Sequence, residues 1–158
     1  MRLTAITAAA VLATGAAFAD TVAPGDVQFG EYGEVATSLS GMDGDADAGR
    51  VIFSSRSKGN CAACHAVAQL PDVAFQGEVG PELTWTGEAR TAEELRGIVS
   101  NAKMTFPDTV MPAFYKTTGF TRPGDGYTGK AATGELSPIL SAQEIEDVVA
   151  FLLTLQES

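Results

Sequence analysis

Three residues that can bind a cofactor or a metal lie within five positions of one another. The two cysteines of the chain, Cys61 and Cys64, are three positions apart, and its single histidine, His65, follows immediately. This C-x-x-C-H pattern is typical of covalent haem attachment, in which each thiol adds across one vinyl group and the histidine binds the iron. A disulfide or a thiol–disulfide exchange pair is the alternative, but no βαβ pattern accompanies the cysteines, and a zinc site would need a second ligand cluster. The motif therefore predicts one covalently bound haem c.

A second axial ligand for the iron must come from elsewhere in the chain. Since there is no further histidine, methionine is the natural neutral donor, and His/Met ligation raises the reduction potential of the iron. Met111 is the favoured ligand, because Pro112 follows it and the fixed φ of proline helps to hold a rigid loop. Met104, directly after a predicted helix, and Met42, near the N-terminus, stay as alternatives.

The loop of residues 79–83 is expected to orient the histidine. A ligating histidine generally donates its other ring nitrogen to a carbonyl, which fixes the ring. The loop resembles the Gly-Pro-x-Leu segment of small c-type cytochromes, and this resemblance implies that the Pro81 carbonyl accepts that hydrogen bond and that Leu83 packs on the haem. An ordinary turn is the alternative interpretation.

Three helices are predicted to position these residues. The first begins near Asp45 or Asp47, because aspartates in a first turn favour a helix start. The sequences at 91–94 and 141–144 are capping boxes, Thr-Ala-Glu-Glu and Ser-Ala-Gln-Glu, and apolar residues at helical spacing follow each of them.

Long loops connect these helices. Residues 66–90 and 104–140 are rich in Gly and Pro and show no convincing strand alternation. Such loops lack the apolar area to order themselves, and a large apolar cofactor at the centre would supply it. The sequence therefore predicts an all-α fold with few helices and long loops wrapped around one haem.

Composition limits the classes of partner. The chain has 158 residues, enough for one core, with a net charge of −10 and a pI near 4.4. Nucleic acid and anionic membrane surfaces would repel such a chain, so neither is an expected partner.

The N-terminus has the features of an export signal. Arg2 precedes a short apolar run that ends in Ala17-Phe18-Ala19, a signal-peptidase pattern. The run is shorter than the roughly 20 residues of a membrane span. We therefore expect residues 1–19 to be cleaved after Ala19 and the mature protein to be periplasmic.

The mature chain is predicted to have two parts. Residues 20–44 contain several Gly and acidic residues but no Lys or Arg, and we expect an acidic, irregular leader that lies over the domain surface. Residues 45–158 form the expected cytochrome c domain.

Beyond the haem motif, several segments resemble one family of monohaem cytochromes, the SoxX subunits of SoxAX sulfur-oxidation cytochromes. The similar segments are residues 33–35, 38–41, 111–116, 119–120 and 138–152. The resemblance covers most of the mature chain and implies a class I cytochrome c fold.

The resemblance also implies partners and a reaction. In this family the chain pairs with a SoxA-like dihaem or monohaem subunit, and the complex acts as an L-cysteine S-thiosulfotransferase. Thiosulfate is joined oxidatively to a cysteine of a SoxYZ-like carrier protein, and the electrons pass to a soluble cytochrome c. The bond-forming residues are expected on the partner chain, while the His65/Met111 haem of this chain relays electrons. A free, mobile electron carrier is the alternative function.

Overall fold

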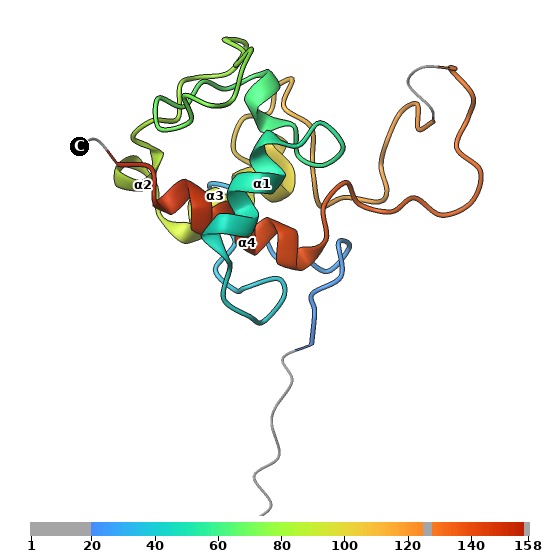
Figure 1. The fold of residues 1–158 in the computed structure, drawn as a ribbon. Helices are drawn as coiled ribbons and strands as arrows, with labels where there is room; N and C mark the ends of the chain where they lie inside the picture. Colours follow the sequence, from blue (N-terminus) through green and yellow to red (C-terminus); the bar gives the residue numbers. More distant parts are fainter. Residues whose placement is uncertain (1–19, 125–127, 157–158) are drawn as a thin grey trace, which may run out of the picture.

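The computed structural model describes residues 20–124 and 128–156 (Figure 1). The predicted signal peptide, residues 1–19, lies outside the described residues. The elements in chain order are α1 (Ala46–Ser54), η1 (Cys61–Ala63), α2 (Thr86–Ala89), α3 (Ala92–Asn101), η2 (Ala102–Met104) and α4 (Ala142–Leu153), where η denotes a 3-10 turn. The two described ranges contain no strand, apart from one isolated antiparallel bridge between Gly124 and Ala131, so the predicted all-α fold is confirmed. No helix within these ranges is both long and apolar enough to cross a membrane.

Local capping fixes where the three longer helices begin. The Asp45 side chain accepts hydrogen bonds from two backbone N–H groups of the first turn of α1, at 2.9 and 3.1 Å. Thr91 and Ser141 each form the predicted capping box with the glutamate three positions later. The helix α2 and both 3-10 turns are too short to carry a periodic apolar pattern, so the sequence does not predict them.

Helices α1 and α4 cross at the centre of the fold (Figure 1). Gly49 allows the close approach, because a Cβ atom at this position would collide with the Asp147 carbonyl of α4. Next to this contact, the rings of Phe53 and Phe151 meet edge to face, with centroids 5.4 Å apart. The crossing fixes the two helices against each other and forms one wall of the core.

The leader contributes to the core, which corrects the expectation that it lies over the surface. Residues 20–44 form turns without a helix or strand. However, Val35 and Leu39 are only 3% and 1% exposed, and Val22, Val27 and Phe29 pack against the core. The backbone N–H of Val22 donates to the Leu39 carbonyl at 2.8 Å. The leader is therefore folded against the helices rather than merely solvated.

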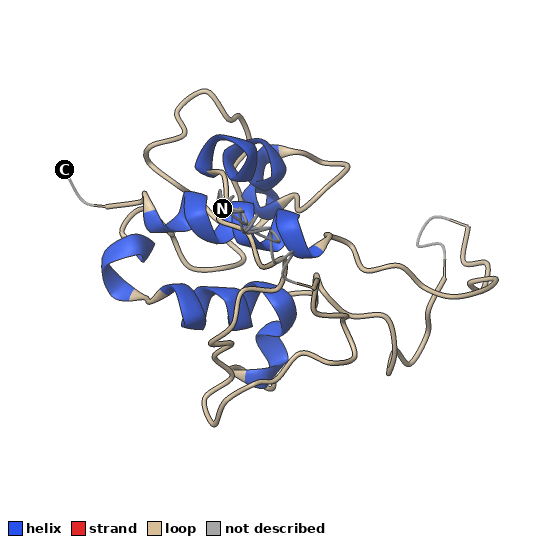
Figure 2. Cartoon of the chain, turned by 90° about the horizontal axis from the view of Figure 1, so that it is seen from below, coloured by secondary structure: helices blue, strands red, loops and turns tan. Residues whose placement is uncertain are grey.

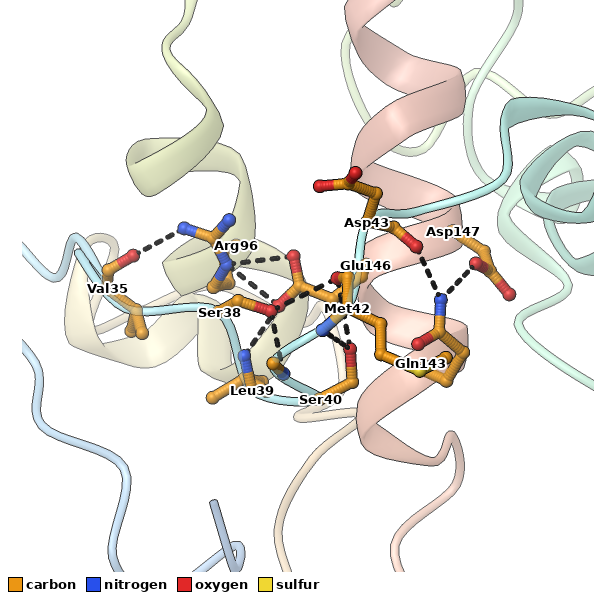
Figure 3. A network of polar contacts seen from close by, with 11 residues as sticks. Val35, Ser38, Leu39, Ser40, Met42, Asp43, Arg96, Gln143, Glu146 and Asp147 are labelled. Carbon is orange, nitrogen blue, oxygen red and sulfur yellow. Dashed lines mark hydrogen bonds and ion pairs between the residues drawn. The ribbon is translucent and has the colours of Figure 1, made fainter. Parts of the chain in front are cut away.

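A buried ion pair holds the leader against α3 and α4 (Figure 3). Arg96 Nε lies 2.9 and 3.1 Å from the two carboxylate oxygens of Glu146, and these residues are 8% and 4% exposed. Each partner also binds the leader backbone: Arg96 Nη1 donates to the Val35 carbonyl at 2.7 Å, and Glu146 Oε1 accepts from the Leu39 N–H at 2.7 Å. One side-chain pair thus joins three segments.

Residues 116–124 and 128–139 leave the helical body as a long excursion, which lies away from the helices in both views (Figures 1 and 2). Its described residues form no helix, and the Gly124–Ala131 bridge links its two branches.

Candidate haem site

A largely apolar cavity of about 580 Å³ opens beside α3 and the loops that follow α1. Its size falls within the roughly 300–1,000 Å³ of typical cofactor sites. Helix α3 contributes Leu95, Ile98 and Val99, and α4 contributes Leu152. All six sequence-predicted site residues line this cavity: Cys61, Cys64, His65, Pro81, Leu83 and Met111.

The attachment motif folds as a single tight turn. Asn60, just before it, has the left-handed φ of 49°, and its carbonyl accepts from the N–H of Ala63 at 3.1 Å. The Cys61 carbonyl then accepts from the N–H groups of both Cys64 and His65 at 3.0 Å. These bonds place both sulfurs and the imidazole at one cavity.

The environment of Cys61 does not favour thiol–disulfide exchange. The two thiols are not joined to each other. Burial raises the pKa of the Cys61 thiol to about 12, against a partial lowering by a backbone hydrogen bond. Exchange proteins instead need a thiol pKa below the ordinary value, so that the reactive thiolate is populated near neutral pH.

The imidazole ring is oriented from the opposite loop. His65 Nδ1 lies 2.7 Å from the Pro81 carbonyl oxygen. Because a carbonyl can only accept, Nδ1 is the protonated nitrogen in this contact, and in the neutral ring this tautomer leaves the Nε2 lone pair for a metal. Gly80 must lack a side chain here, since a Cβ would collide with the His65 ring, and its N–H donates to the Cys64 carbonyl at 2.8 Å.

Among the described methionines, Met111 lies at the cavity and the two alternatives do not. Met104 and Met42 are 47% and 63% exposed and are absent from the cavity wall. Thr109 fixes the Met111 backbone, because its Oγ1 accepts from the Met111 N–H at 3.2 Å. The Thr109 carbonyl in turn accepts from Lys103 Nζ at 2.5 Å, so the loop is tied to η2.

Comparison with known proteins identifies the fold family. The Cytochrome c family profile matches residues 46–156. A chain in the crystal structure of SoxXA from P. pantotrophus is 53% identical with a TM-score of 0.83, and the match covers 87% of this chain and 100% of that chain. The chain belongs to the SoxX family of c-type cytochromes.

Two further comparisons gave a weaker match and no match. The c-type cytochrome SorU from Sinorhizobium meliloti is 29% identical over 70% of this chain and 90% of its own, with a TM-score of 0.43. No curated protein sequence matches the chain. Membership of the SoxX family confirms the class I cytochrome c fold and the single covalent haem c predicted from the sequence.

The residues at the cavity fit this haem. The apolar walls suit a porphyrin, and two thiols and one imidazole with a free Nε2 face the same space. When bound, the haem supplies one-electron iron chemistry, while the protein sets its ligands and surroundings. Without the cofactor, the large apolar cavity would leave the loops of this SoxX-family chain poorly supported.

Sequence reasoning missed two aromatic residues of the cavity wall. Trp85, the single tryptophan, and Phe106 both line the cavity, while remaining 49% and 44% exposed. Neither belongs to a periodic apolar pattern, so the only available signal is a large aromatic residue in a Gly- and Pro-rich segment.

Gln76 is a second residue that the sequence does not indicate. Its side chain bridges the loop after the haem motif: Oε1 accepts from the Val67 N–H at 2.6 Å, and Nε2 donates to the Leu70 carbonyl at 2.9 Å. Val67 and Leu70 are both 1% exposed. The amide thus satisfies two backbone groups next to the core and keeps the loop closed behind the attachment turn.

Proposed function

We propose that this chain is the haem-bearing electron-transfer subunit of a two-chain, thiosulfate-oxidising cytochrome complex. The observation that carries the proposal is the 53% identity to a chain in SoxXA from P. pantotrophus, which extends over the whole of that chain. Its partner would be a SoxA-like dihaem or monohaem cytochrome. A free electron carrier would share the haem but would have no stable partner chain.

The reaction requires an electron acceptor of this kind. Joining thiosulfate to a carrier-protein cysteine forms one sulfur–sulfur bond, releases the thiol proton and removes two electrons from the reacting sulfurs. This chain supplies no sulfur nucleophile, because both of its cysteines lie at the haem cavity. As the resemblance implies, the residues that catalyse bond formation to the carrier would belong to the SoxA-like partner, and this chain would pass the electrons on to a soluble cytochrome c.

We assign the site residues as follows. Cys61 and Cys64 would hold the haem through their sulfurs, and His65 and Met111 would bind its iron. The Pro81 carbonyl orients His65, and Leu83 packs on the porphyrin. A His/Met pair gives a higher reduction potential than ligands that donate more strongly, which suits a subunit that accepts electrons.

Two measurements test the proposal. Mixed with a SoxA-like chain at micromolar concentration, the purified red protein should elute from a size-exclusion column as a heterodimer. With thiosulfate and the SoxYZ-like carrier added, its haem should become reduced. Separate elution of the two chains, with no haem reduction, would favour the free carrier.

Export is the remaining part of the proposal. We propose that the chain acts in the periplasm after cleavage between Ala19 and Asp20. Mass spectrometry of the protein from the periplasmic fraction should give the mass of residues 20–158 plus one haem. A mass that includes residues 1–19 would contradict this assignment.

A further inference from the structure

The excursion formed by residues 116–124 and 128–139 has a firmly held base. Phe114 and Leu140, at its two ends, are 5% and 0% exposed, and the Leu140 N–H donates to the Phe114 carbonyl at 3.0 Å. The Tyr115 N–H donates to the Ser100 carbonyl of α3, also at 3.0 Å. The base lies three residues after Met111, so the direction of the excursion is tied to the Met111 side of the haem cavity.

Beyond this base, the excursion has no core of its own. None of its described side chains, at residues 116–124 and 128–139, is buried. Its two branches are joined by the Gly124–Ala131 bridge and by a 3.2 Å hydrogen bond from the Ala132 N–H to the Pro123 carbonyl. Ordering the backbone of one residue costs about 1–2 kcal/mol in conformational entropy. In the excursion, no buried side chain offsets this cost. Long loops of this kind in compact domains are usually functional or disordered.

The chemistry of the excursion differs from that of the chain as a whole. The sequence of residues 116–139 contains three basic and two acidic residues, whereas the whole chain has a net charge of −10. Arg122 and Lys130 are exposed, and neither forms an ion pair within the described residues. Phe120 and Ile139 are 43% and 51% exposed and lie outside the haem cavity wall. Exposed aromatic and arginine side chains are enriched in protein interfaces.

We propose that residues 116–124 and 128–139 form a docking arm for the second cytochrome chain, an inference that rests on the proposed function. The partner surface is acidic, to match Arg122 and Lys130, and has apolar recesses for Phe120 and Ile139. Partner contacts supply the burial that the arm lacks. Because the arm starts beside the Met111 loop, it holds the partner on that side of the haem cavity, which keeps the electron path between the two chains short.

Affinity measurements on arm variants of the haem-loaded protein test this proposal. The double variants Phe120→Ala/Ile139→Ala and Arg122→Glu/Lys130→Glu should each raise the Kd for a purified SoxA-like chain by tenfold or more. The charge variant should also lose most of the salt dependence of binding, because screening acts on exposed charges. Isothermal titration at low and high salt measures both effects.

Matched control variants come from the helical body. Val51 on α1 is 65% exposed, and Arg56 is exposed and forms no ion pair within the described part of the chain. Val51→Ala and Arg56→Glu should change the Kd less than threefold. All variants should keep the wild-type haem spectrum and reduction potential, which shows that the fold is intact.

The outcomes separate the two proposals. If the wild-type chain itself does not bind the SoxA-like chain, the proposed function fails. If the wild type binds and the arm variants bind with the same affinity, the docking arm is refuted while the proposed function stands.

Discussion

Replacing Glu146 with glutamine should strongly destabilise the protein, although the side chain keeps its shape. In the wild type, Arg96 and Glu146 are 8% and 4% exposed, and two short bonds join them (Figure 3). Glutamine preserves an oxygen that can accept from the Leu39 N–H, but it removes the negative charge. Arg96 then remains buried without a counter-ion.

The free-energy cost of such a buried, unpaired charge sets the expected loss of stability. Removing one partner of a buried ion pair typically costs about 3–5 kcal/mol, out of a total stability of about 5–15 kcal/mol. For a chain of this size, about 1 kcal/mol shifts the Tm by roughly 3 °C, so the Tm should fall by about 10 °C. The loss should be cooperative, since the pair joins the leader, α3 and α4.

Thermal and guanidinium unfolding of the haem-loaded protein, followed by far-UV circular dichroism, measure this loss. Asp72→Asn is the matched control, because Arg50 also binds Asp72 through two bonds, of 2.6 and 2.8 Å, but these side chains are 40% and 63% exposed. Solvent screens that pair, so its variant should unfold close to the wild type.

Hydrogen exchange at the Leu39 amide gives a local measure. In the wild type the Leu39 N–H is bonded to the Glu146 carboxylate at 2.7 Å. Its exchange should accelerate in Glu146→Gln, because the leader opens more often once Arg96 lacks a counter-ion, and it should stay slow in Asp72→Asn. If Glu146→Gln unfolds at the wild-type temperature and protects this amide equally, the pair does not hold the leader, and the reasoning is wrong.

Three further predictions concern the haem loop, the helix crossing and acid stability. Met111→Ala should keep the haem attached but lower its reduction potential by ~0.1–0.3 V, within the roughly 0.8 V range that different axial ligands produce. An unchanged potential and absorption spectrum would show that another residue binds the iron. Gly49→Ala should cost about 2 kcal/mol or more in chemical unfolding, since its Cβ would meet the Asp147 backbone of α4. Partial burial opposes ionisation of Glu144, but hydrogen bonds from Lys58, at 2.5 Å, and from the N-cap serine outweigh it and hold the Glu144 pKa below its usual 4.5. Lys58→Met should therefore be less stable than the wild type above pH 4.5, and unfolding curves should converge as the pH falls through the folded-state pKa; a constant difference would contradict this.

Features with local causes could be predicted from the sequence. The capping boxes at Thr91 and Ser141 depend on residues three positions apart, so pattern alone locates the starts of α3 and α4. The attachment motif likewise lies within five positions. One neighbouring proline favours Met111 over Met104 as the ligand, and in the structure Met111 lines the cavity.

Features with distant causes could not be predicted. The hydrogen bond from Leu39 to Glu146 joins residues 107 positions apart, and no periodic pattern links them. Both side chains of the ion pair are charged, and charged residues are rarely buried unless paired, so the sequence favours an exposed position for each. Because the leader is acidic, its composition predicts an exposed segment and does not indicate that Val35 and Leu39 lie in the core.

The ion pair and the haem cavity use different residues of the same two helices. On α3, Leu95 and Val99 line the cavity while Arg96 faces the leader; on α4, Leu152 lines the cavity while Glu146 faces the leader. Since side chains in a core are closely packed, a shift of α3 against α4 at the ion pair would also change the packing at the cavity wall. The packing of the leader against α3 and α4 therefore helps to fix the helices that form the cavity wall. Loss of the folded leader should change the shape of the haem site.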